Sequence, residues 1–92
     1  MLLHIGQGRT VPLESVIAMM DLTSSPSPGA RQVMEALKAR GHLHALSADP
    51  HSLILLSGTG DRAELTGYLT PVGMRTLRTR ASLSPEDLIQ KG

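Results

Sequence analysis

The chain has 92 residues, a formal net charge of +1 and no cysteine. This length suits one domain, the composition excludes disulfide cross-links, and the charge excludes a globally basic nucleic-acid binder. Tyr68 is the only aromatic residue of the Phe, Tyr and Trp types, so the core has to be built from aliphatic side chains, which bury less area than aromatic ones. We therefore expect the chain to bury further apolar surface in a homo-oligomer.

The first quarter of the chain predicts a β-hairpin followed by a buried strand. Residues 2–5 form the first strand, Gly6-Gln7-Gly8 supplies a tight turn, and residues 9–11 return. Pro12 lacks a backbone donor, so it ends the second strand or lies on a sheet edge. Residues 16–22 are almost uninterruptedly apolar, which predicts a strand covered on both faces.

Residues 30–40 predict an amphipathic helix. The residues before it supply a start signal, with Ser27 as N-cap and Pro28 at the first helical position. Gly41 follows the last turn as a C-cap signal. Four apolar side chains share one helix face at the spacing i, i+3, i+4 and i+7: Ala30, Val33, Met34 and Leu37.

The second half of the chain predicts three more strands and a second helix. Residues 42–46 alternate as a half-buried strand does, and residues 53–56 form a buried strand. A Gly-containing turn then leads into a returning strand from about residue 63 to 68. A second helix is expected over residues 70–81, with Pro71 near its first turn.

The predicted fold class is therefore α+β, a small single domain of residues 1–81 with five or six short strands and two helices. It contains an N-terminal hairpin and a later hairpin. Residues 82–92 form a C-terminal tail, in which Ser84-Pro85-Glu86-Asp87 is a further helix start signal and predicts a short helical turn.

Three arginines, Arg75, Arg78 and Arg80, cluster in a stretch from residue 66 to 85 that contains no acidic residue. At about 100° per residue, a helix places Arg78 and Arg80 on either side of its apolar stripe and Arg75 further outward. Such arginines can contact DNA phosphates without reading bases. They can equally be the solvated flanks of a core-facing helix or ion-pair partners. The apolar stripe itself consists of Met74, Leu77 and Ala81.

Catalytic and metal sites have little support in the sequence. His42 and His44 share one strand face, but neither a cysteine nor an adjacent acid completes a zinc site. Gly6-Gln7-Gly8 leads into an extended segment instead of a helix, which argues against a dinucleotide cradle. The serines before the first helix have no base nearby in the sequence. We therefore expect no enzyme activity, no metal or other cofactor, and no small-molecule substrate.

The apolar runs are too short to cross a membrane. The longest, residues 16–20 and 53–56, fall far below the roughly 20 residues that a spanning helix needs. Residues 1–4 lack the charged and apolar pattern of a secretory leader. We therefore expect a cytoplasmic protein without a membrane partner.

The order and spacing of these elements resemble the RemA/RemB family of small bacterial extracellular-matrix regulators over nearly the full chain. The likeness begins with the Gly6-Gln7-Gly8 hairpin and its apolar strand, and continues through the helix that ends at Arg40-Gly41 and the strand at 53–56. The stretches 50–54 and 76–81 favour the RemB branch. The resemblance implies a cytoplasmic regulator of biofilm matrix that self-assembles, for which a ring is one form, and presents basic residues to duplex DNA.

In the RemA branch the basic residues lie mainly in two loops, which here read Leu13-Glu14-Ser15 and Asp49-Pro50-His51-Ser52. The resemblance therefore makes His51, and Arg9 on a nearby loop, candidates for phosphate contacts after Arg75, Arg78 and Arg80. Glu14 and Asp49 place acids where the family carries basic residues. This favours the alternative of an oligomeric assembly or protein-interaction module that does not bind DNA.

Overall fold

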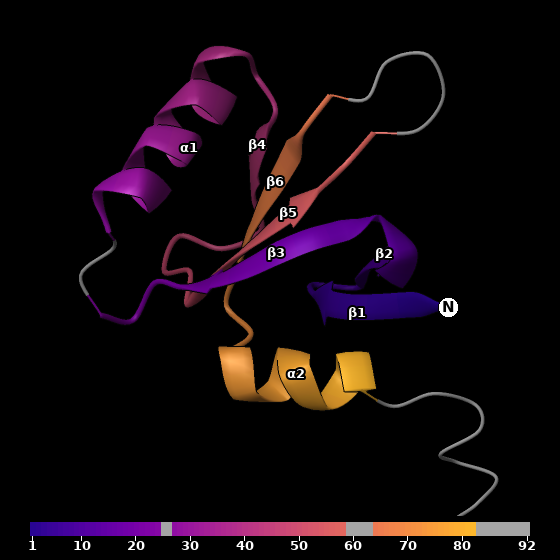
Figure 1. The fold of residues 1–92 in the computed structure, drawn as a ribbon. Coiled ribbons are helices and arrows are strands. Elements are labelled where there is room, and N and C mark those ends of the chain that lie inside the picture. Colours follow the sequence, from indigo (N-terminus) through magenta and orange to yellow (C-terminus); the bar gives the residue numbers. More distant parts are fainter. Residues whose placement is uncertain (25–26, 59–63, 83–92) are drawn as a thin grey trace, which may run out of the picture.

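The computed structural model describes residues 1–24, 27–58 and 64–82, which form the small α+β fold that the sequence predicts (Figure 1). These residues contain six strands in two sheets, two α-helices and a short 3-10 turn. In chain order the elements are β1 (Leu2–Gly6), β2 (Arg9–Pro12), the 3-10 turn (Leu13–Ser15), β3 (Val16–Asp21), α1 (Pro28–Ala39), β4 (Leu43–Ala45), β5 (Ser52–Leu56), β6 (Thr66–Thr70) and α2 (Met74–Ser82).

The larger sheet has four strands in the order β3-β5-β6-β4. β5 pairs antiparallel with both of its neighbours, whereas β4 joins β6 in parallel. The predicted N-terminal hairpin is a separate two-stranded sheet of β1 and β2. α1 lies beside the larger sheet at one end of the molecule, and α2 lies below β1 at the other end (Figure 1).

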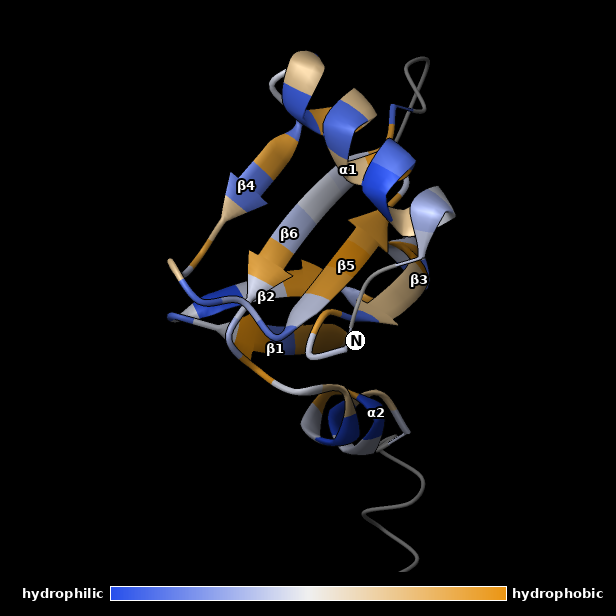
Figure 2. Cartoon of the chain, turned by 90° about the vertical axis from the view of Figure 1, so that its left-hand side faces the viewer, coloured by the Kyte–Doolittle hydropathy of each residue, from blue (hydrophilic) through white to orange (hydrophobic). Residues whose placement is uncertain are grey.

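Two apolar clusters lie on opposite faces of β5, because successive side chains of a strand point to opposite sides of the sheet. Ile54 and Leu56 pack with the hairpin and with Leu77 of α2. Leu53 and Leu55 pack with Leu37 of α1. All five residues of β5 are buried, and the strand is hydrophobic along most of its length (Figure 2). The predicted buried strand is thus the centre of the fold.

The helix signals of α1 are confirmed in detail. Ser27 is the N-cap, and its hydroxyl accepts a hydrogen bond of 3.1 Å from the amide of Ala30. Pro28 is the first helical residue. The helix is capped at Arg40, and Gly41 follows with a φ of +73°, a backbone conformation that glycine adopts without steric cost.

The prediction that residues 16–22 form a strand covered on both faces is wrong for the single chain. β3 is an edge strand and none of its residues is fully buried. The register with β5 shifts between Val16 and Ala18, so that Ile17 is an extra residue in a bulge. Its side chain is 56% exposed.

The boundary between the last strand and the second helix also differs from the prediction. β6 covers Thr66–Thr70, later than the expected residues 63–68, and α2 begins at Met74 instead of residue 70. The Thr70 hydroxyl accepts a hydrogen bond of 3.1 Å from the amide of Val72, which stabilises a turn at Pro71 in place of a helix start. The described part of α2 covers Met74–Ser82, and the predicted helical turn in the tail lies outside the described residues.

Candidate functional site

α2 presents the predicted arginine cluster on the surface. Leu77 is fully buried against the hairpin side of the sheet, and Met74 and Ala81 pack partly against the same cluster. This is the predicted apolar stripe. The three arginines of the cluster are exposed, and the helix contains no acidic residue. Because the stripe faces the core, the arginines are left on the exposed part of α2.

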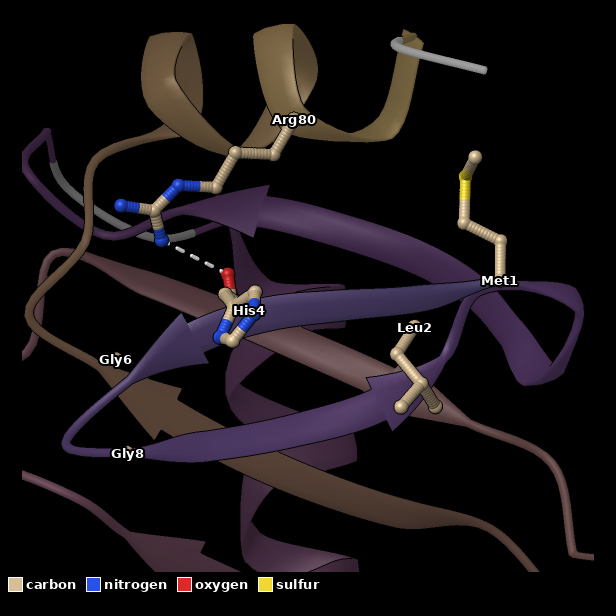
Figure 3. A pocket seen from close by; sticks show the side chains of 6 residues that line it. All are labelled: Met1, Leu2, His4, Gly6, Gly8 and Arg80. Atoms are coloured by element: carbon tan, nitrogen blue, oxygen red, sulfur yellow. Dashed lines mark hydrogen bonds between the residues drawn. The ribbon is translucent and has the colours of Figure 1, made fainter. Parts of the chain in front are cut away.

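Arg80 crosses from α2 to the hairpin. Its Nη1 donates a hydrogen bond of 2.9 Å to the backbone carbonyl of His4, in the middle of β1 (Figure 3). The guanidinium lies beside an open hollow of about 480 Å³. The described residues that line this hollow include no acid; they are Met1, Leu2, His4, Gly6, Gly8 and Arg80.

Arg78 and His51 both influence the charge of one acid, Asp21. Hydrogen bonds from the Thr23 hydroxyl (2.6 Å) and amide (2.8 Å) lower the pKa of Asp21 below its ordinary value. Nearby positive charge on His51 and Arg78 lowers the pKa of this exposed carboxyl further. The fold thus places two predicted phosphate contacts, 27 residues apart in the sequence, within electrostatic range of one carboxylate.

Arg9 stands apart from the other candidates in its contacts. Its Nη2 donates a hydrogen bond of 2.8 Å to the Tyr68 hydroxyl, and the guanidinium carbon lies 5.1 Å from the centre of the Tyr68 ring. The His44 ring lies 5.2 Å from the same ring. Arg9 therefore connects the hairpin to the larger sheet, and this contact gives it a structural role.

The two histidines that share a strand face in the sequence prediction have different partners in the structure. His42 lies 3.4 Å from a carboxylate oxygen of Glu64, whereas His44 packs on Tyr68. Among the described residues no group of three or more potential ligands of the His, Cys, Asp and Glu types could hold a metal ion. Neither α1 nor α2, the helices of the described chain, has the length and apolar character to cross a membrane.

Two residues that contact or influence the arginines of α2, His4 and Asp21, were not predicted from the sequence. His4 alternates with the buried residues Leu3 and Ile5, so the two-residue period of a strand could have placed it on the outward face. Asp21 lies at the end of a strand far from α2 in the sequence, and no local pattern connects the two. Only the tertiary arrangement brings Asp21 close to Arg78.

Comparison with known proteins does not add to this arrangement. No family model matches the sequence, and the curated proteins give no significant match.

Proposed function

We propose that this protein is a cytoplasmic DNA-binding transcriptional regulator of the RemA/RemB type, closer to RemB, which acts as a homo-oligomer and contacts the phosphates of duplex DNA. The order of strands and helices and the sequence stretches quoted above support the family. The exposed arginines of α2 support duplex DNA as the ligand. Its regulatory role would be control of the extracellular matrix of a biofilm.

The observation that carries the proposal is the placement of Arg80. The hydrogen bond to the His4 carbonyl uses one of the five N–H donors of the guanidinium, and it holds the group beside an open hollow whose described lining contains no acid. An arginine fixed in this way loses little freedom when it binds a phosphate oxygen. Arg78 lies on the other side of the apolar stripe of α2 and Arg75 further outward, and both are exposed, so they add positive charge to the helix surface.

A single subunit offers few phosphate contacts. α2 carries three exposed arginines, and the negative charge of Asp21 reduces the positive potential around Arg78 and His51. Repetition of these arginines in a homo-oligomer would raise the affinity, because each further contact is then intramolecular. Binding without base contacts is consistent with arginines aimed at the phosphate backbone.

The experiment is fluorescence anisotropy of a labelled random-sequence duplex, at low and at near-physiological salt. Binding is expected to fall steeply with salt, because bound phosphates release counterions. Replacing both Arg78 and Arg80 by Ala should weaken binding and reduce the slope of log K against log salt by about 2 per subunit in contact. The matched control is the double variant Arg31→Ala/Lys38→Ala, which removes the same charge from α1.

The positions of three acidic residues favour a second candidate, an assembly or interaction module that does not bind DNA. Asp21 is within electrostatic range of Arg78 and His51. Glu14 and Asp49 are exposed, in the two segments where the resemblance implies basic residues in the RemA branch. No binding to the duplex at low salt by an intact oligomer would select this candidate. An unchanged slope in the Arg78/Arg80 variant would reject the assignment of these two residues.

A further inference from the structure

A second surface lies on α1, near the end of the molecule opposite α2. It is a groove of about 430 Å³ with two walls. One wall is the side of α1, and the other is the chain just before β6. The described residues that line the groove are Val33, Ala36, Leu37, Arg40, Glu64 and Leu65.

The floor of the groove is apolar and its rim carries two opposite charges. Leu65 is one of the four large hydrophobic side chains that are notably exposed among the described residues, at 43%. Ala36 is exposed on α1 beside it, and its small side chain leaves room for close approach. Arg40 lies on the helix wall, whereas Glu64 lies on the opposite wall and within 3.4 Å of His42 Nε2.

We propose that this groove is the interface through which two copies of the chain associate about a two-fold axis. A two-fold axis along the groove would exchange its two walls, so that each helix wall meets the other copy's wall at residues 64–65. Leu65 of each copy would then pack on Val33 and Ala36 of the other, and each Arg40 would face the other copy's Glu64. In a two-fold interface every such pair is formed twice.

Charge complementarity selects a second copy as the occupant. A surface that carries a cation on one wall and an anion on the other complements itself after a half-turn, and opposite charges across an interface also fix its register. The apolar floor supplies the area to be removed from water. The aliphatic core of this small chain is a further reason to bury apolar surface in this way. The inference rests on the homo-oligomer of the proposed function, but it involves neither α2 nor DNA.

The test is sedimentation velocity of the full chain without DNA, over a wide concentration range. The wild type should form a species with twice the mass of the 9.8 kDa chain or an even multiple of it. Arg40→Glu and Glu64→Arg alone each put like charges across the interface and should raise the dissociation constant about tenfold or more. The combined variant Arg40→Glu/Glu64→Arg should restore association to near the wild-type level.

Two further variants make the test independent of folding defects. Leu65→Asp should dissociate the dimer, whereas Arg31→Glu, the same charge change elsewhere on α1, should leave it unchanged. Circular dichroism checks that each variant is folded. A monomeric wild type, a double swap that fails to restore association, or an oligomer unaffected by Leu65→Asp would each overturn the proposal. Sedimentation without DNA measures mass alone. A failed association is therefore distinguished from a failure to bind DNA.

Discussion

Ser52 and Thr70 lie directly opposite each other in the β5–β6 pair, and both side chains are fully buried, but their hydroxyl groups are in opposite situations. The Thr70 hydroxyl donates to the carbonyl of Ile5 in β1 and accepts from the amide of Val72. It thus links β6, the hairpin and the turn before α2. The Ser52 hydroxyl has no hydrogen-bond partner among the described residues.

Substitutions at these two positions should therefore change stability in opposite directions. Thr70→Val removes the hydroxyl that serves the buried Ile5 carbonyl and the part-buried Val72 amide and should lower the free energy of unfolding by about 1 to 3 kcal/mol. Ser52→Ala removes a buried hydroxyl that has no partner and should raise it by about 1 kcal/mol. Urea unfolding of both variants measures this difference. A loss of stability in Ser52→Ala would show that its hydroxyl is satisfied in solution.

Two glycine-to-alanine substitutions should also change the free energy of unfolding in opposite directions. A methyl group at Gly67 would lie 2.8 Å from Leu37 Cδ1 and 3.1 Å from Leu43 Cδ1. Because Leu37 is buried between α1 and the sheet, Gly67→Ala should cost about 1 to 3 kcal/mol. Gly29→Ala, in the first turn of α1, meets no atom closer than 4.0 Å and should stabilise the helix by up to about 1 kcal/mol. Thermal unfolding of the two variants provides the comparison, and equal melting temperatures would contradict it.

The contact between Arg9 and Tyr68 should contribute to stability more than to DNA binding. Tyr68→Phe removes the 2.8 Å hydrogen bond but keeps the ring beneath the guanidinium, and it should cost about 0.5 to 1.5 kcal/mol in the free energy of unfolding. The same variant should bind the random-sequence duplex as the wild type does. If the anisotropy shows that Tyr68→Phe weakens DNA binding as strongly as the Arg78/Arg80 variant does, Arg9 is instead a phosphate contact that Tyr68 orients.

The lowered pKa of Asp21 predicts that the stability of the fold depends on pH in the acidic range. Its folded-state pKa lies below the ordinary value of 3.8, so its ionised form stabilises the fold above that value, and this contribution is lost as the pH falls through the folded-state pKa. Thr23→Val removes the hydroxyl donor and should move the pKa of Asp21 upward, toward 3.8. A carboxyl titration followed by NMR measures the shift. Ser24→Ala, which leaves both donors in place, should not change it.

The sequence predicts the parts of the fold that depend on local patterns. The spacing of Ala30, Val33 and Leu37 and the cap at Ser27 identify α1 to within two residues at its start. The apolar run at 53–56 identifies the central strand. In these segments, helix or strand periodicity coincides with the face that becomes buried.

The predictions are wrong where contacts between residues that are distant in the sequence determine the structure. Residues 16–22 are apolar enough for a central strand, but the order of strands in the sheet puts them at an edge. Thr70 belongs to β6 because it pairs with Ser52 and contacts Ile5, and neither contact is visible in local periodicity. The candidate site follows the same rule. The helix stripe predicts that the arginines are exposed. The hydrogen bond of Arg80 to His4 and the electrostatic influence of Arg78 on Asp21 come from tertiary packing.

The position of Tyr68 gives this protein a built-in optical reporter. Because the chain contains no tryptophan and one tyrosine, its intrinsic emission comes from the junction where Arg9 of the hairpin and His44 of β4 flank a single ring. Emission during unfolding therefore follows the detachment of the hairpin, whereas far-ultraviolet circular dichroism follows the helices and the larger sheet. Coincident transitions would mean that the two sheets unfold as one cooperative unit, and an earlier change in emission would mean that the hairpin separates first.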